Sequence, residues 1–478
     1  MWCGLSDGAA SVEYVFDGCD EAGLLAVMGE AQRAERVAVA RRVLAAGRLC
    51  QRRMAAAVAG EREQWCVDNW EAVAAEVAAQ LGITRGRASA LMNYGVELLE
   101  RLPRLAAVFA AGQADFAVIT AVVFRTGLIT DRAALAGIDA VLARRVGRLA
   151  ALSRRRVAEI IDAWVTHFDP AALRNARRAE AERHIRFGEP HDGMVQFWGA
   201  LRATDAAVLD QRLTGLAATA CRGDSRTQDQ RRADALAALA DGRTRLDCDC
   251  AAPDCTPVQR ARGAIGITVL ATAETLSGAD DTPGHLPGYG AIPAEQVRAL
   301  AARARLRRLP DPAQLRAEPR YQPSAALAEF VKARDLFCRF PGCDQPAQVC
   351  DIDHTVPWAA GGLTHPSNCK LLCRLHHLLK TFWTGPHGWR DTQHPDATIT
   401  WTSPSGQTYT TTPGGTLLFP RLAVPTGAPT PPPAPPARPA RDRQPPVRER
   451  TRAAQRAARI AWERGLNQRR WAADPPPF

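Results

Sequence analysis

Four residues in the second half of the chain have the types and spacing of a zinc site. Cys338 and Cys343 are separated by four residues, which suits one knuckle of a tetrahedral site. Cys373 and His376 lie three positions apart, so on a helix both side chains face the same ion. Two such pairs hold distant segments together in a module too small to be stabilised by its own core. The sequence therefore predicts a structural zinc here.

A second set of polar residues lies between and beside these ligands. Asp353 and His354 end an apparent strand, VCDIDH, and a Gly-Gly pair, Asn368 and His377 follow. Adjacent side chains on a helix point about 100° apart, so His376 and His377 can serve two different sites. The segment resembles the HNH nuclease motif of the ββα-metal fold, DH…P…GG…N…LCxxCHxxK, with His376 in place of the second cysteine of the last pair.

The resemblance implies hydrolysis of a DNA phosphodiester. His354 would be the general base, because the ordinary pKa of histidine lets it accept a proton near neutral pH. Asp353 and His377 would hold a divalent cation that stabilises charge on the phosphate and the leaving oxygen. Asn368 would tie down the loop that carries the base or reach the metal, and Lys380 would contact a DNA phosphate unless it is a solvated surface residue. Mg²⁺, Mn²⁺, Ni²⁺ and Zn²⁺ are all candidates, since these ligand types do not choose among them.

The other cysteines give weaker signals. Thirteen cysteines behind an N-terminus without a secretory pattern favour reduced thiols and metal ligation over disulfides. Cys248, Cys250 and Cys255 form a Cys-rich turn that lacks a fourth ligand, so metal binding there stays open. Cys350 competes as a zinc ligand, and Cys369 is expected to be a small core residue. Five scattered cysteines suggest no site: Cys3, Cys19, Cys50, Cys66 and Cys221.

The N-terminal half has the pattern of a helical domain. Apolar residues recur three and four positions apart over residues 21–242. Within this region, EVAAQLGITRGRASALM places Ala78 one turn before Gly82, as in a helix-turn-helix. The second helix of that unit would direct Arg85 and Arg87 toward a major groove of DNA. An ordinary helical hairpin is the alternative.

These patterns predict a mainly α protein in four regions. Residues 20–242 form an all-helical domain, and residues 243–319 hold the Cys-rich turn, a strand and a connecting helix. Residues 320–422 form the ββα-metal nuclease module with a β-hairpin, and residues 423–478 are a Pro/Arg-rich tail, largely disordered, in which a basic helix can form. The net charge is +11, and the chain from Arg421 onward holds 12 arginines against four acidic residues. The tail is therefore expected to associate loosely with phosphates or to act only as a solubilising segment.

The resemblance extends beyond the nuclease motif. The stretches QRRADALAALADG, CDCAAPDC, GYGAIPAEQVRALA and YQPSAALAEFVKARDLFCRFPGC are similar to the 13E12 repeat family of bacterial proteins. In that family a helical DUF222 domain precedes a C-terminal HNH nuclease. The similarity covers residues 20–422 and implies DNA binding, zinc binding and endonuclease activity, often in mobile or repeated elements.

We therefore predict a metal-dependent HNH endonuclease that acts on DNA in the cytoplasm of a bacterium. No membrane span is expected, because the most apolar stretch, residues 105–124, contains Gln113 and Asp115. The alternatives are a non-catalytic zinc-containing DNA-binding regulator and an interaction protein whose helical domain is the functional part. The sequence specifies neither the target site, nor nicking or double-strand cleavage, nor the oligomeric state.

Overall fold

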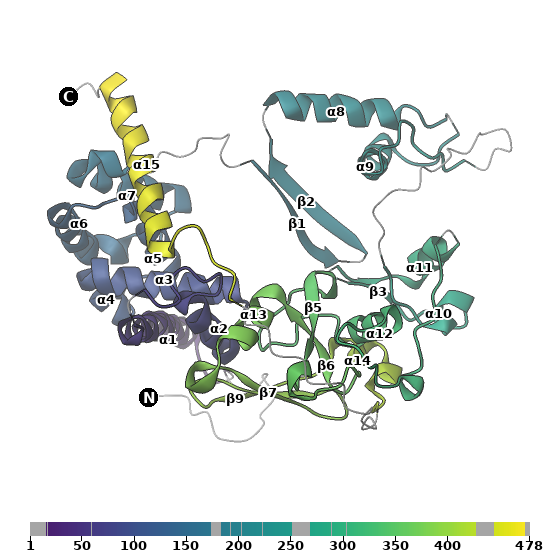
Figure 1. The fold of residues 1–478 in the computed structure, drawn as a ribbon. Helices are drawn as coiled ribbons and strands as arrows, with labels where there is room; N and C mark the ends of the chain where they lie inside the picture. Colours follow the sequence, from purple (N-terminus) through teal and green to yellow (C-terminus); the bar gives the residue numbers. More distant parts are fainter. Residues whose placement is uncertain are drawn as a thin grey trace. The chain divides into compact units, whose positions relative to one another are not determined.

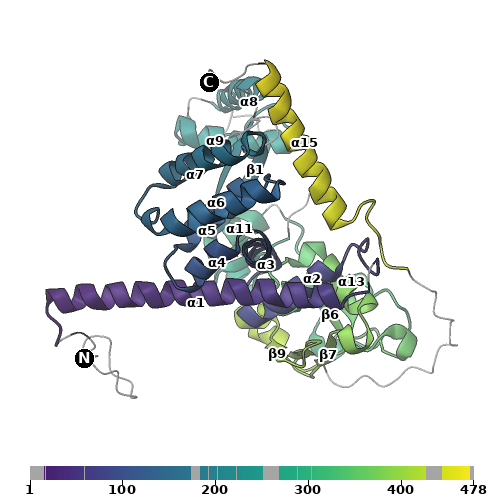
Figure 2. The same ribbon diagram turned by 90° about the vertical axis from the view of Figure 1, so that its left-hand side faces the viewer.

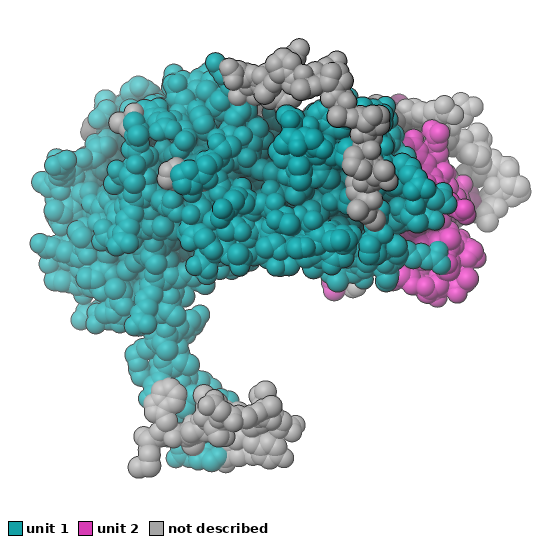
Figure 3. Space-filling model, turned by 60° about the horizontal axis from the view of Figure 1, so that its bottom comes forward, with its two compact units in different colours: residues 1–175, 310–478 teal, residues 176–309 magenta. Residues whose placement is uncertain are grey.

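The structure is mainly α-helical and divides into two compact units (Figures 1 and 3). Unit 1 comprises residues 1–175 and 310–478, and unit 2 comprises residues 176–309. The computed structural model describes residues 16, 18–58, 60–173, 183–191, 193–201, 203–221, 223–250, 268–287, 289–302, 304–426 and 444–473. Among the described helices, none has both the length and the apolar character needed to cross a membrane.

Seven α-helices make up most of the described N-terminal part of unit 1, as the sequence pattern predicted. They are α1 (Glu21–Ala56), α2 (Asn69–Leu81), α3 (Arg85–Arg101), α4 (Pro103–Ala110), α5 (Phe116–Thr126), α6 (Arg132–Arg145) and α7 (Arg154–Phe168). Five of them begin at an Asp or Ser whose side chain accepts a hydrogen bond from a backbone N–H of the first turn, which satisfies a group that would otherwise lack a partner. The buried residues of α1 begin only at Ala40, and Figure 2 shows its N-terminal half projecting from the other helices.

The C-terminal module of unit 1 is built from short strands and helices. Its elements are α12 (Ala325–Asp335), β5 (Cys350–His354), β6 (Cys369–Cys373), α13 (Arg374–Phe382), β7 (Arg390–Gln393), β8 (Ile399–Thr402), β9 (Thr408–Thr411) and α14 (Gly414–Leu418). Strands β5 and β6 are antiparallel, with Cys350 opposite Cys373 and His354 opposite Cys369. The hairpin predicted around Ser405 is β8–β9, and β7 adds a third strand to it.

The helical part and the C-terminal module share one hydrophobic core. Val67 and Ala79 from the helical part lie in the same buried cluster as Trp383 and Trp401 from the module. The indole Nε1 of Trp383 donates a hydrogen bond to the backbone oxygen of Val67 at 2.9 Å. The regions predicted as separate domains, residues 20–242 and 320–422, are therefore packed together across α2.

The expectation of an all-helical region up to residue 242 is wrong, because unit 2 contains strands as well as helices. Its elements are β1 (His184–His191), β2 (Met194–Ala200), α8 (Ala203–Ala217), α9 (Gln228–Ala240), α10 (Ala273–Ser277), β3 (Gly284–Leu286), β4 (Gly290–Ile292) and α11 (Ala294–Ala301). Strands β1 and β2 pair as an antiparallel hairpin, because β-branched and aromatic residues are concentrated in HIRF and MVQFW. The strand expected in AIGITVLA is described only from residue 268, where Leu270 makes an isolated bridge to His285.

The C-terminal tail contains the basic helix that the sequence allowed, although the tail was expected to be largely disordered. Residues 452–473 form α15 (Arg452–Ala473), drawn in yellow in Figure 2, whereas residues 427–443 lie outside the described residues. The arginines of the tail pair with carboxylates of the helical part: Arg448 and Arg452 with Asp68, Arg452 with Glu71, Arg456 with Glu97, and Arg464 with Asp169. Four arginines of the described part of the tail thus have carboxylate partners in the helical part.

A substitution that removes one positive charge of α15 should show whether these ion pairs stabilise the protein. Arg452→Gln is expected to lower the free energy of unfolding by about 1–3 kcal/mol, because buried Asp68 and Glu71 each lose a charged partner. Urea denaturation followed by circular dichroism measures the change. Arg459→Gln, on the exposed side of the same helix, should change stability by less than about 0.5 kcal/mol. Equal effects of the two substitutions would show that α15 does not depend on these ion pairs.

Candidate active site and metal centre

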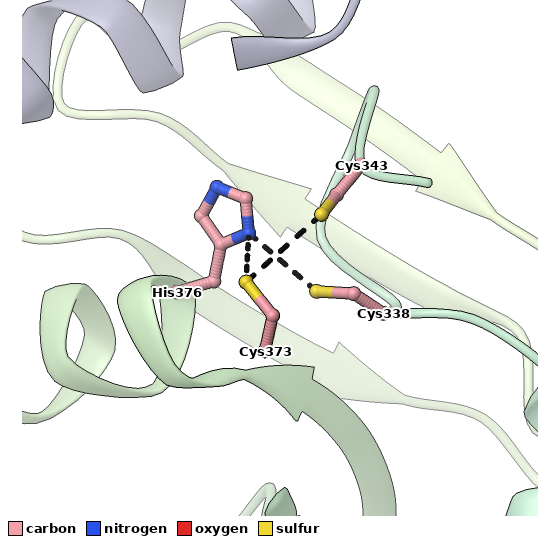
Figure 4. Close-up of side chains that lie close together, drawn as sticks. All are labelled: Cys338, Cys343, Cys373 and His376. Atoms are coloured by element: carbon pink, nitrogen blue, oxygen red, sulfur yellow. Dashed lines mark hydrogen bonds between the residues drawn. The ribbon is translucent and has the colours of Figure 1, made fainter. Parts of the chain in front are cut away.

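The structure brings the four predicted zinc ligands together (Figure 4). Cys338 and Cys343 lie on the loop after α12, Cys373 ends β6, and His376 lies in the first turn of α13. Nδ1 of His376 is 3.5 Å from Sγ of Cys338 and 3.3 Å from Sγ of Cys373, and the sulfurs of Cys343 and Cys373 are 4.0 Å apart. Zinc bonds of about 2.3 Å to sulfur and about 2.0 Å to nitrogen separate ligand atoms in a tetrahedron by about 3.5–3.8 Å. The four side chains therefore could hold a metal ion such as zinc.

The remaining cysteines of this module are not part of the cluster. Sγ of Cys350 lies 3.4 Å from the backbone oxygen of Gln345, and Cys350 is not one of the four residues whose ligand atoms all lie within 4.8 Å of one another. Cys369 is fully buried in the core, as predicted. The ring of His376 stacks on Phe340 with centroids 3.9 Å apart, which fixes the plane of the imidazole. The competition from Cys350 that the sequence left open is thereby resolved in favour of the predicted four.

Asp335 attaches the cysteine loop to strand β6. Its carboxylate is buried and accepts hydrogen bonds from Arg334, from Arg339 and, at 2.9 Å, from the backbone N–H of Leu371. Burial alone would raise the pKa of Asp335, but the two guanidinium groups outweigh it and hold that pKa below its usual range. The charged carboxylate therefore joins α12, the cysteine loop and β6 at one point.

The predicted helix-turn-helix shape is present, but the cysteine loop covers its turn. Gly82 ends α2 with a φ of +59°, and α3 begins three residues later. A Cβ on Gly342 would lie 2.8 Å from the backbone oxygen of Ile83, so the two turns are in direct contact. Nη1 of Arg85 donates a 2.8 Å hydrogen bond to Glu71 within the chain, and its expected contact with DNA stays a prediction. Arg87 is exposed, and its role stays a prediction.

His354 lies at the end of β5, and its ring is held in place by its neighbours. Its Nε2 is 2.8 Å from Oγ1 of Thr364, and that hydroxyl lies 2.6 Å from the backbone oxygen of Arg320, to which it donates. The Thr364 oxygen consequently accepts from an Nε2–H of His354, and Nδ1 carries the lone pair. Tyr321 stacks on the ring at 5.3 Å. Burial lowers the pKa of His354 below its ordinary value, which keeps the imidazole neutral near pH 7.

Asp353 lies in a network with two lysines and a second aspartate. Nζ of Lys370, which is fully buried, contacts Asp353 at 2.7 Å and Asp391 at 2.6 Å. Nζ of Lys380 contacts the same two carboxylates at 2.8 and 3.1 Å and also the backbone oxygen of His354. Burial alone would raise the pKa of Asp353, but the two lysines outweigh it and hold that pKa below its usual range. The ammonium of Lys380 is thus held inside this network, and its contact with a DNA phosphate stays a prediction.

His377 lies opposite Asp353. Nε2 of His377 is 3.7 Å from Oδ1 of Asp353, the oxygen that faces away from the lysines, and Nδ1 is 2.9 Å from Oδ2 of Asp351. Two atoms that are each about 2.1 Å from one ion can be separated by this distance. A carboxylate on the far nitrogen is the usual orienting partner of a metal-bound histidine. The pair thus fits a divalent cation that takes its other ligands from water or substrate.

Asn368 ties down the loop between β5 and β6. Its Oδ1 accepts a hydrogen bond from the N–H of Val356 at 2.8 Å, and its Nδ2 donates to the backbone oxygens of Val356 and Leu363. Of the two roles that the sequence left open, the structure supports the loop tie, since both ends of the amide are used by backbone groups. In the structure Asn368 therefore positions the loop that follows β5.

Sequence reasoning missed several residues of this site. Asp351 could have been found, because Asp351 and Asp353 alternate on a strand and so share a face. Lys370 lies between predicted motif positions, but its burial gave no signal in the sequence. Thr364 and Asp391 contact the site from a loop and from β7, and no local pattern marks them.

A second group of cysteines lies in unit 2. The structure brings together the sulfurs of Cys221, Cys248 and Cys250, which all lie within 4.8 Å of one another. Cys221 was expected to belong to no site, so its inclusion is a correction. Cys255, the third cysteine of the predicted turn, lies outside the described residues.

Comparisons with known proteins give a family but no activity. Residues 30–335 match a family model described as a domain of unknown function, DUF222. The chain is 45% identical to the uncharacterized protein Rv3776 of Mycobacterium tuberculosis strain H37Rv, over 96% of this chain and 92% of that protein. It is 41% identical to the uncharacterized protein Rv2100 of the same strain, over 99% of this chain and 95% of that protein. No solved structure matches the chain significantly.

Proposed function

The chain belongs to the DUF222 family, and we propose that this member is a metal-dependent HNH endonuclease that hydrolyses phosphodiester bonds of DNA. One observation carries the proposal. His354, neutral at the end of β5, follows Asp353, whose carboxylate and His377 could hold a divalent cation. The four-residue cluster that could hold zinc lies in the same module. The predicted base, the two predicted metal-binding side chains and the four zinc ligands thus belong to one module, which supports the proposal.

His354 is proposed to accept the proton of the attacking water. Its Nδ1 carries the lone pair, because Thr364 fixes the proton on Nε2. The water oxygen forms the new bond to phosphorus while the bond between phosphorus and the 3′-oxygen breaks. The 3′-oxygen takes up a proton from solvent, which gives 5′-phosphate and 3′-hydroxyl ends. Asn368 holds the loop that follows His354, so the ring keeps its orientation during the reaction.

Asp353 and His377 are proposed to hold the catalytic cation. When bound, a divalent ion such as Mg²⁺, Mn²⁺, Ni²⁺ or Zn²⁺ supplies positive charge to the phosphate and the leaving oxygen. Oδ2 of Asp353 is engaged by Lys370 and Lys380, which leaves Oδ1 directed to His377. Asp351 orients His377 from behind. The ion pairs therefore position the carboxylate for the metal.

The test is a nicking assay on supercoiled plasmid with purified full-length protein. The protein is first treated with EDTA, and each of the four divalent ions is then added separately. We expect cleavage with at least one ion and none in EDTA alone. Binding of DNA without cleavage in any ion would support the alternative, a zinc-containing regulator.

A substitution of Asp351 tests whether Asp353 and His377 hold a metal ion. Asp351→Asn is expected to raise the metal concentration needed for half-maximal cleavage by about 10- to 100-fold, because His377 loses the carboxylate that orients it. The zinc content, measured after dialysis, should not change, since Asp351 is no part of the four-ligand cluster. Asp344→Asn, at an exposed position of the same module, is the matched control. An unchanged metal requirement in Asp351→Asn would remove His377 from the metal site.

A further inference from the structure

The α8–α9 hairpin of unit 2 has a very small core. Of its described residues, the buried apolar side chains are Leu216, Ala217, Ala235 and Ala238, joined by Leu246 beyond α9. Three of these are alanines, and most of α8 is exposed. A core of this size stabilises a helical hairpin poorly without a cross-link.

Polar contacts join the segment after α8 to the segment after α9. Arg226 donates to Oδ2 of Asp224 at 2.7 Å and to the backbone oxygen of Asp247 at 2.6 Å. The N–H of Asp249 donates to the same Asp224 oxygen at 3.0 Å, and Ser225 donates to the Asp249 carboxylate at 2.6 Å. The side chain of Asp224 is fully buried in these contacts. The two segments are therefore held next to each other by groups other than the cysteines.

The three thiols lie where these segments meet. Sγ of Cys221 is 3.0 Å from Sγ of Cys248, and Sγ of Cys250 completes a group that spans at most 4.8 Å. The three cysteines are half-buried and are not joined by a disulfide. A disulfide bond is about 2.05 Å long, and two thiolates on one tetrahedral zinc are about 3.8 Å apart. A small outward movement of Cys221 and Cys248 would thus accommodate an ion among the three sulfurs.

We propose that Cys221, Cys248 and Cys250 bind a zinc ion that clamps the end of α8 to the segment after α9. Three thiolates select a soft or borderline divalent cation and exclude Mg²⁺ and Ca²⁺. Binding displaces one proton from each of the three thiols, so three protons are released for each ion bound. The resulting site has one negative charge. One tetrahedral position stays available to a further donor.

This proposal is independent of the nuclease function. The clamp lies in unit 2, whereas the cluster of Cys338, Cys343, Cys373 and His376 lies in unit 1. The second ion would be structural, because it stabilises the α8–α9 hairpin. Its expected effect is therefore seen in metal content and in the protection of residues 203–250 from proteolysis.

The experiment measures tightly bound zinc in the full-length protein. The protein is produced with zinc in the medium and dialysed against metal-free buffer. The zinc bound per chain is then measured by inductively coupled plasma mass spectrometry. We expect Cys221→Ser and Cys248→Ser each to hold one zinc per chain fewer than the wild type. Cys66→Ser, a half-buried cysteine outside both clusters, should hold as much as the wild type. Cys343→Ser combined with Cys248→Ser should lose both ions, which separates the two sites.

Two further measurements keep the proposal falsifiable. Limited proteolysis is expected to cut within residues 203–250 faster in Cys248→Ser than in Cys66→Ser. Alkylation of the unreduced wild type followed by mass spectrometry reports any disulfide. Zinc content unchanged in Cys248→Ser would overturn the proposal, and so would a wild type whose Cys221 and Cys248 are joined by a disulfide with no zinc at this site.

Discussion

Replacing His354 by glutamine is expected to lower the rate of plasmid cleavage at least about 10²-fold, the usual contribution of a general base. Glutamine keeps most of the side-chain volume and an N–H that can donate to Thr364, but it has no basic nitrogen. The packing against Tyr321 should therefore persist while the proton acceptor is lost. Initial rates of nicking at saturating metal and protein measure the effect, and His354→Ala should lose at least as much activity.

The controls separate catalysis from stability. Zinc content and the unfolding midpoint of His354→Gln should match those of the wild type, because His354 is not one of the four cluster ligands. His394→Ala removes a histidine that hydrogen-bonds to Thr400 away from the site, and it should cleave normally. Added imidazole should restore part of the activity of His354→Ala. Cleavage by His354→Gln within about threefold of the wild type would exclude His354 as the base.

Replacing Cys343 by serine is expected to remove one zinc ion and to unfold the C-terminal module. Structural zinc binding is worth about 10–16 kcal/mol in small zinc domains, which is comparable with the whole stability of a protein domain. A zinc ion would join the loop of Cys338 and Cys343, which follows α12, to Cys373 of β6 and His376 of α13. Loss of the ion would therefore separate the loop from β6 and α13. Metal analysis after dialysis and limited proteolysis within residues 320–422 measure the two consequences.

Cys350→Ser is the matched control for this substitution. Cys350 lies in the same module, but its sulfur contacts the backbone oxygen of Gln345 and is outside the cluster. Its zinc content should equal that of the wild type. Fluorescence of the buried Trp383, Trp389 and Trp401 should change in Cys343→Ser and stay constant in Cys350→Ser. Zinc retained in Cys343→Ser, or lost in Cys350→Ser, would contradict the assignment of the ligands.

The lysine contacts of Asp353 decide which variant can test the metal pair. Removing the Asp353 carboxylate would leave the fully buried ammonium of Lys370 with fewer negative partners, and an unbalanced buried charge is strongly destabilising. Loss of cleavage in Asp353→Ala would therefore mix a metal effect with a folding effect. Asp351 avoids this difficulty because its carboxylate is only half-buried and contacts His377 from outside the network.

The sequence determined those features that depend on residues close together along the chain. The pairs Cys338–Cys343 and Cys373–His376 sit on one loop and one helix turn, so local geometry alone directs each pair toward one point. The helices of the first part followed from apolar residues three and four apart, and the β8–β9 hairpin from alternation around a turn. The motif likewise placed His354 at the end of a strand. In each case the partners are only a few residues apart, and the period of the backbone fixes their relative directions.

The tertiary structure alone decided which charges and thiols have partners. Lys380 and Arg85 look like surface cations in the sequence, yet Lys380 meets Asp353 and Asp391, and Arg85 meets Glu71. Cys221 lies 27 residues before Cys248, and only the packing of α8 on α9 brings their sulfurs together. Arginines of α15 pair with carboxylates that lie 295 to 384 residues away along the chain. Contacts at such separations depend on how whole helices pack, and the periodicity of one segment carries no information about the charge that faces it.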